Sequence, residues 1–119
     1  MKKLSFLFAV LFFVFAVSNY AQPVIKSGRY AADYNVSGYG LHINDGVRSF
    51  EIEVVFDEAF SVRPEVLLNV DLVDVEKSGN TRYKLEVKSL NKEGFIIKIT
   101  AWADTKVNGL AGSWLAYTK

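Results

Sequence analysis

The most constraining feature of this sequence is the regular alternation of apolar and polar residues in several short segments. Ser49–Phe56 carries an apolar side chain at every second position, with Glu51 and Glu53 between them, and Thr81–Leu90 repeats the pattern. A period of two is that of a β-strand with one face buried and the other in water. After the first 21 residues, no segment has the helical spacing of a competing α-helix.

The same reasoning extends to the rest of the chain and predicts six strands. Their expected ranges are Val24–Ala32, Ser49–Phe56, Glu65–Val75, Thr81–Leu90, Phe95–Ala103 and Gly112–Thr118. Turn-forming residues separate them, including Asn91–Gly94, where we expect Gly94 to take a positive φ. Short strands at roughly ten-residue spacing indicate an all-β fold, a six-stranded antiparallel β-sandwich.

Two of these strands carry more apolar residues than one buried face can use. In Glu65–Val75 the pattern points Leu72 inward, and Leu67 breaks the alternation. In Phe95–Ala103, Ile96 and Trp102 point away from the expected core. A local bulge with scattered surface apolar residues explains this as well as a second face buried against another subunit. The pattern alone leaves both explanations open.

The first 21 residues have the pattern of a targeting segment. A cationic start, Met1–Lys3, precedes the apolar run Leu4–Val17 and a short polar region. This run is shorter than the roughly 20 apolar residues of a membrane span and is typical of a secretory signal peptide. We expect cleavage after Ala21, with Ser18 as the second choice. Residues 22–119 are then one secreted, extracellular domain.

Charge and residue usage exclude several classes of function. Without Lys2 and Lys3, 12 of the 14 basic residues remain against 13 acidic ones, so the net charge is about −1. This balance argues against a nucleic-acid partner. The absence of Cys excludes a disulfide scaffold and a thiol nucleophile, and His42 as the single His excludes a His-rich metal site. We find no catalytic constellation, and expect neither enzyme activity nor a cofactor. Oligomerisation would supplement the core of so small a domain.

Five further segments, in one order, resemble the H-type lectin domain, the family of the snail agglutinins and the discoidin C-terminal domain. These segments are Phe56–Leu68, Leu72–Arg82, Gly94–Phe95, Ala101–Val107 and Trp114–Tyr117. The resemblance runs from about Ile43 to Tyr117. It implies a six-stranded antiparallel β-sandwich that assembles as a homotrimer and binds galactose or N-acetylgalactosamine without calcium.

The resemblance also assigns a sugar site. Asp45 matches an acidic residue that accepts hydrogen bonds from sugar hydroxyls, and Arg82 matches an arginine that donates to neighbouring hydroxyls. A carboxylate and a guanidinium together complement a vicinal diol through charge-assisted bonds. Asn80 matches a polar residue near the site, and Trp102 an aromatic residue that lies against the sugar. In the family these last two groups come from an adjoining subunit.

Two positions depart from the snail pattern. Ala103 stands where a His meets the N-acetyl group, and Asn108 stands where a Tyr packs on the sugar. Recognition of the N-acetyl group is therefore open, and galactose or another glycan remains an option. Asp104 and Lys106 flank the same loop and could compensate.

Simpler interpretations of these residues stay open at this point. Without the resemblance, Arg82 is best explained as a surface ion-pair partner of Glu53 or Glu86, and Asp45 as a turn residue before a glycine. The functional hypothesis is a secreted, trimeric, calcium-independent lectin with a role in adhesion or glycan recognition. The alternative is a trimeric assembly module of the same fold that does not bind sugar.

Overall fold

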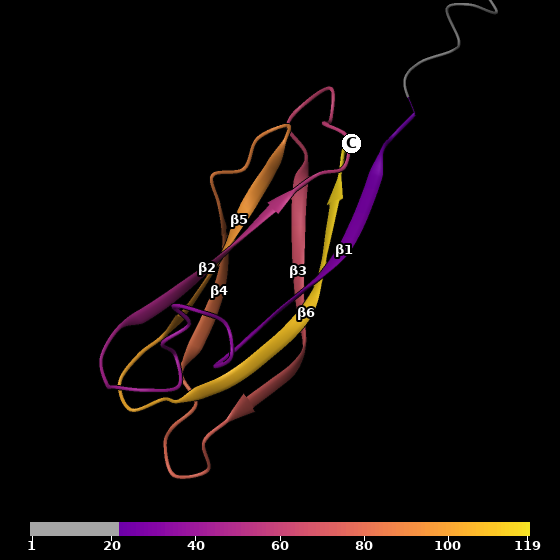
Figure 1. Ribbon diagram of the computed structural model, residues 1–119. Helices are drawn as coiled ribbons and strands as arrows, with labels where there is room; N and C mark the ends of the chain where they lie inside the picture. The colour runs from indigo at the N-terminus through magenta and orange to yellow at the C-terminus, as the bar shows by residue number, and fades with distance from the viewer. Residues whose placement is uncertain (1–21) are drawn as a thin grey trace, which may run out of the picture.

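A computed structural model describes residues 22–119, which form two three-stranded antiparallel sheets packed face to face (Figure 1). The strands are β1 (Ile25–Asp33), β2 (Arg48–Val55), β3 (Glu65–Val75), β4 (Tyr83–Lys88), β5 (Gly94–Ala101) and β6 (Val107–Tyr117). Their order is β1-β6-β3 in one sheet and β2-β5-β4 in the other. The expected six-stranded antiparallel β-sandwich is confirmed. The described residues include no helix long and apolar enough to cross a membrane.

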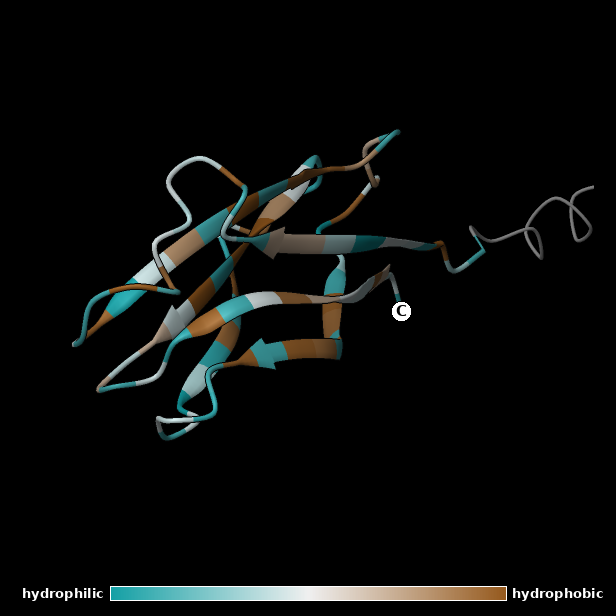
Figure 2. Cartoon of the chain, turned by 60° about the horizontal axis from the view of Figure 1, so that its bottom comes forward, coloured by the Kyte–Doolittle hydropathy of each residue, from teal (hydrophilic) through white to brown (hydrophobic). Residues whose placement is uncertain are grey.

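The core lies between the two sheets, where the alternation placed it. Phe95, Ile97 and Ile99 of the central strand β5 are all buried, and the ring of Phe95 meets that of Trp114 in β6 edge to face at 5.6 Å between centroids. Brown and teal segments alternate along the strands in Figure 2, as expected where one face of each strand meets the other sheet. The period-two pattern is therefore the direct cause of the two layers.

Strand β6 is longer than expected, since it begins at Val107 and not at Gly112. The expected strands did not include residues 107–111, and Gly109 and Gly112 both lie inside the central strand β6. A Cβ on Gly109 would lie 3.1 Å from the Cβ of Asp33, and one on Gly112 would collide with the carbonyl oxygen of Asn69. These glycines allow neighbouring groups to approach the strand closely.

A register shift in β3 changes which of its residues face outward. The pairing with β6 is irregular between Val70 and Leu72, so Asp71 is an extra residue in the ladder. The expectation that Leu72 points inward was wrong: its side chain is 55% exposed. The bulge thus turns Leu72 to the outer face, where Leu67 already lies by the regular alternation before the shift.

A second expectation, about Gly94, was also wrong. The positive φ near this connection belongs to Ser89, at 54°. Gly94 is instead the first residue of β5, where a Cβ would collide with the carbonyl oxygen of Val54. The glycine is required by the close approach of β2.

The outer faces of the two sheets differ in character. On the β2-β5-β4 sheet, oppositely charged side chains pair across the surface, with Lys88 2.5 Å from Glu51 and Lys84 3.7 Å from Glu86. The β1-β6-β3 sheet also carries an ion pair, between Arg29 and Asp71 at 2.8 Å, but it presents exposed aliphatic side chains as well. These are Ile25, Leu67, Leu72 and Leu115.

Candidate functional site

Three connections gather at one end of the sandwich, the lower end in Figure 1. They join β1 to β2, β3 to β4 and β5 to β6, and consist of residues 34–47, 76–82 and 102–106. All the residues assigned to the sugar site lie in these connections, except Asn108, which lies just inside β6.

Backbone hydrogen bonds tie the three connections together. The amide of Gly46 donates to the carbonyl of Ala103 at 2.9 Å, and the amide of Trp102 donates to the carbonyl of Arg82 at 3.3 Å. The connection 102–106 is thus held between the other two. This links the regions of Asp45 and Arg82, which are far apart in the sequence.

The long connection 34–47 is anchored by a buried tyrosine. Tyr39 is 2% exposed, and its hydroxyl donates to the carbonyl of Val107 at 2.9 Å. Burial, together with the charges of Asp33 and Asp74, raises the pKa of Tyr39 to about 12. The hydroxyl therefore remains a neutral donor.

Asp45 projects from this connection into solvent. Its carboxylate accepts a hydrogen bond from the ammonium of Lys106, which also donates to the carbonyl of Asn44 at 2.6 Å. This hydrogen bond, the positive charge of Lys106 and, more weakly, that of Arg48 lower the pKa of Asp45. The carboxylate is thus kept ionised and oriented, and it retains oxygen lone pairs for other donors.

The backbone on both sides of Asp45 is left-handed. Asn44 has φ 64° and Gly46 has φ 85°, and across the site Ala103 has φ 58°. For residues other than glycine this conformation costs about 1–2 kcal/mol each. It persists here because the surrounding hydrogen bonds over-determine it, a situation that is common at functional sites.

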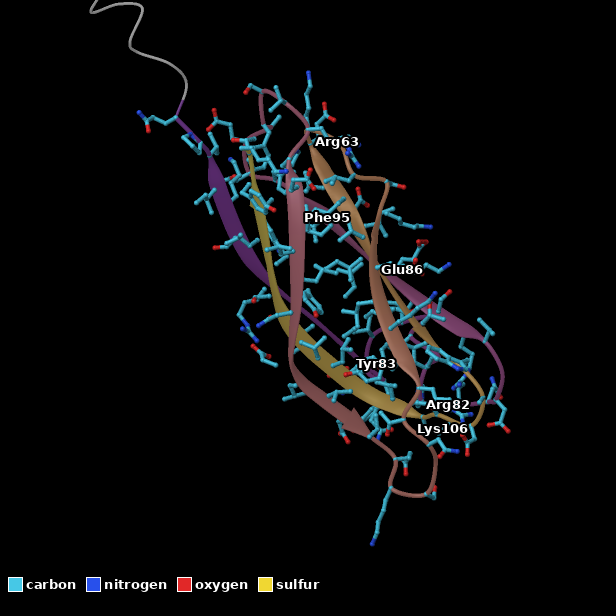
Figure 3. The ribbon with its side chains drawn as sticks, turned by 180° about the vertical axis from the view of Figure 1, so that it is seen from behind. Arg63, Arg82, Tyr83, Glu86, Phe95 and Lys106 are labelled. Atoms are coloured by element: carbon cyan, nitrogen blue, oxygen red, sulfur yellow. The ribbon has the colours of Figure 1, made fainter. Side chains whose placement is uncertain are left out.

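Arg82 is held through its backbone while its side chain remains exposed. Its amide donates to the hydroxyl of Thr105 at 2.8 Å, and this buried hydroxyl donates in turn to the carbonyl of Asn80 at 2.6 Å. Within residues 22–119 the guanidinium makes no ion pair, and Glu86, one expected surface partner, pairs with Lys84. Figure 3 labels Arg82 and Lys106 at the same end of the sandwich.

The remaining assigned residues fall into two groups. Asn80 lies beside Arg82 and donates to the carboxylate of Asp104 at 3.4 Å. Trp102 follows directly on β5 and is half-buried, so it is less exposed than the strand pattern predicted. The side-chain amide of Asn108 donates to the carboxylate of Glu76 at 3.2 Å, and the backbone carbonyl of Asn108 accepts from the backbone amide of Tyr34.

A single chain therefore brings Asp45, Asn80, Arg82 and Trp102 to one end, where Lys106 hydrogen-bonds to Asp45. The side chain of Asn108 bonds to Glu76, at the start of the 76–82 connection that follows the neighbouring strand β3, and makes no bond to Asp45 or Arg82. Sequence reasoning missed Thr105 and Arg48, which hold the connections. Neither carries a spacing signal, because the partners of Thr105 are distant in sequence and the nearby partners of Arg48 are backbone carbonyls, which every residue has.

Other polar groups at this end do not form a metal centre. Among residues 22–119 no group of three or more His, Asp or Glu side chains is placed to hold a metal ion. His42 lies 5.8 Å from the rings of both Tyr34 and Tyr39, and its Nδ1 is buried without a hydrogen-bond partner.

A β-sandwich with a carboxylate, a guanidinium and a tryptophan on joined loops at one end has the architecture of a small sugar-recognition domain. Two structures of discoidin II from Dictyostelium discoideum have this fold. The wild-type structure has a TM-score of 0.72, with 21% identity over 83% of this chain. The native recombinant structure has a TM-score of 0.71, with 21% identity over 82%. This chain spans 38% of the length of either discoidin chain.

A family model of the H-type lectin domain matches residues 51–117, so this chain belongs to the H-type lectin domain family. The matched range includes Arg82 and Trp102 and begins after Asp45. A protein of Fuscovulum blasticum named "ATP synthase subunits region ORF 7" is 28% identical over 79 residues, which cover 66% of this chain and 69% of that protein.

Proposed function

We propose that this protein is a lectin that binds galactose- or N-acetylgalactosamine-type glycans through Asp45 and Arg82. The observation that carries the proposal is that residues 102–106 hydrogen-bond to the connections of both residues, at one end of the sandwich. The Asp45 carboxylate accepts from one sugar hydroxyl and the Arg82 guanidinium donates to its neighbour. Because Arg82 has no carboxylate partner among the described residues, no internal ion pair has to break on binding.

Trp102 and Lys106 complete the proposed site. The solvent-facing part of the Trp102 ring offers a surface for the C–H face of a sugar, as amphipathic aromatic side chains do. Lys106 keeps the Asp45 carboxylate ionised, and its ammonium has a third N–H for a ligand oxygen. In this arrangement Lys106 replaces a polar contact that Ala103 cannot make.

We further propose that the protein acts as a secreted homotrimer after removal of residues 1–21. The aliphatic outer face of the β1-β6-β3 sheet supports an assembly that covers it. Because the side chain of Asn108 bonds to Glu76 and not to Asp45 within one chain, we assign it to the site of another copy. Three weak sites, each with a Kd on the order of 1 mM, would give useful avidity on a glycan-coated surface.

Binding, without catalysis or a cofactor, is the activity we propose. A carboxylate–guanidinium pair on an exposed rim suits recognition of hydroxyl groups. The role that follows is adhesion to, or recognition of, glycan-bearing surfaces.

A trimeric assembly module without sugar binding is the second candidate. It is favoured by Ala103 and Asn108, which lack the His and Tyr side chains of the snail pattern, and by the aliphatic sheet face. A glycan array separates the two candidates, because this candidate requires a trimer by light scattering and no signal on any glycan.

The decisive experiment compares Asp45→Ala with Asp57→Ala on galactose and N-acetylgalactosamine resins. Both aspartates are exposed and ion-paired with a lysine, but Asp57 pairs with Lys26 outside the three connections of the site. We expect Asp45→Ala to abolish retention and Asp57→Ala to leave it unchanged, with the same oligomeric state for both. Equal retention of the two variants would rule out the assigned site.

A further inference from the structure

Arg48, the first residue of β2, makes an unusual set of contacts beneath the proposed site. Its Nε donates to the carbonyl of Gly46 at 2.8 Å, and its Nη2 donates to that of Ala103 at 3.4 Å. Its Nη1 donates to the carbonyls of Leu41 at 3.3 Å and Ile43 at 3.0 Å. One guanidinium thus holds four backbone carbonyls from two connections.

These contacts surround Asp45. Ile43 and Gly46 lie on either side of it, and the carbonyl of Ala103 also accepts the Gly46 amide. The residues bonded in this way include the left-handed Gly46 and Ala103. Two of the four carbonyls also accept backbone amides, that of Ala103 from Gly46 and that of Leu41 from Val107, both at 2.9 Å.

We propose that Arg48 is a positioning residue for sugar binding: it clamps the 34–47 connection to the 102–106 connection, so that Asp45 and Trp102 are held in one arrangement before a ligand arrives. This inference rests on the proposed function. Arg48 itself does not touch the sugar. Its effect is pre-organisation, which reduces the loss of loop freedom on binding and so increases affinity.

The chemistry of the contacts requires an arginine. A guanidinium has five N–H donors fixed in a plane, whereas an ammonium has three donors at a single point. A lysine at this position keeps the charge and much of the length, but it cannot reach four carbonyls that lie around the edge of a planar fork. Arg48→Lys therefore removes the contacts of the clamp while it keeps the positive charge.

The test uses the full chain and the variants Arg48→Lys and Arg63→Lys. Arg63 is a matched control because its Nε also donates to a backbone carbonyl, that of Leu90 at 3.2 Å, at the opposite end of the molecule (Figure 3). The readouts are the Kd for galactose and N-acetylgalactosamine, and amide hydrogen exchange at Gly46. Exchange at the buried Ile99 monitors the fold.

We expect Arg48→Lys to raise the Kd at least about tenfold and to accelerate exchange at Gly46, with Ile99 unchanged. Arg63→Lys should change neither readout. Rapid exchange of Gly46 in the wild-type chain would overturn the clamp even if the variant fails to fold. Unchanged exchange and Kd in a folded Arg48→Lys variant would overturn it as well. If the wild type binds no sugar but exchange at Gly46 responds to Arg48→Lys, the proposed function fails and the clamp stands.

Discussion

The two ends of the sandwich use similar polar pairs for different purposes. At the end of the proposed site, Lys106 pairs with Asp45 and Arg48 binds backbone carbonyls. At the opposite end, Lys26 pairs with Asp57 at 2.9 Å and Arg63 binds one carbonyl. The pKa of both aspartates is lowered, in each case first by the lysine hydrogen bond. Ion pairs alone therefore do not distinguish a site from a stabilising surface.

The difference lies in what surrounds these pairs. The opposite end is closed by aromatic rings: Phe56 and Phe60 meet edge to face at 4.9 Å, and the ammonium of Lys26 lies 5.5 Å from the Phe60 ring. The site end has left-handed backbone at Asn44, Gly46 and Ala103, whereas the opposite end has it at Ser89. One end is built around a packed core, and the other presents oriented polar groups to solvent.

The largest expected effect tests the aromatic end. Phe56 is 6% exposed and contacts three other rings. Phe56→Ala should reduce the free energy of unfolding by about 3–5 kcal/mol, because it removes buried surface and leaves a cavity. Denaturant unfolding gives the magnitude. If the aromatic end only stabilises the fold, the folded fraction of this variant should bind sugar with the wild-type Kd. A changed Kd would contradict the functional separation of the two ends.

The next effect tests the site end. Arg82→Ala should weaken sugar binding by about 1.5–3 kcal/mol, because it removes charge-assisted hydrogen bonds to the ligand. The free energy of unfolding should hardly change, since Arg82 is bound to the fold through its backbone. Titration calorimetry measures the first quantity and denaturant unfolding the second. Arg63→Ala is the control. A similar loss of sugar affinity in that variant would contradict the assignment of sugar binding to the site end alone.

A pH titration sharpens the comparison between the two aspartates. Each has a lowered pKa in the folded chain, so its ion pair stabilises the fold above the ordinary pKa of Asp and stops doing so as pH falls through the lowered value. Carboxyl NMR should show a lowered pKa for both aspartates. Sugar binding should follow Asp45 alone, and Lys106→Gln should move its loss to higher pH. A binding curve that instead responds to Lys26→Gln would contradict this assignment.

The smallest expected effect concerns backbone strain. Ala103→Gly should be neutral or slightly stabilising, by up to about 1 kcal/mol, because relief of the left-handed strain outweighs the added freedom of the unfolded chain. Ala59→Gly, in the exposed 56–64 connection without positive φ, should cost about 0.4–1 kcal/mol. Thermal unfolding compares them. Equal destabilisation of the two variants would mean that Ala103 is not strained.

The sequence predicted the layers of this protein better than its irregular positions. The inward positions Phe95, Ile97 and Ile99 were assigned correctly, since alternation is a local property of a strand, but the strand ends at Ala101, before Trp102 and Ala103. The direction of Leu72 and the start of β6 were not assigned correctly. The bulge at Asp71 and the close packing around Gly112 depend on strands β3 and β6 meeting, and neighbouring residues carry no trace of that.

The site shows the same division. Asp45, Asn80, Arg82, Trp102 and Asn108 were assigned through resemblance to a family, and the assignment of the sugar contacts remains a prediction. Arg48 and Thr105, which hold the connections, gave no signal, because a guanidinium under four carbonyls looks in sequence like any arginine at a strand start.

The sequence by itself determined that this chain is all β, which faces of its strands are buried and which family it belongs to, because these depend on short-range periodicity and residue identity. Only the tertiary structure decided that residues 45, 82 and 102 share one end, that Arg82 stays unpaired among the described residues, and that the side chain of Asn108 bonds to Glu76. Those outcomes follow from how two twisted sheets pack and from which loops their ends bring together, and no local pattern encodes that packing.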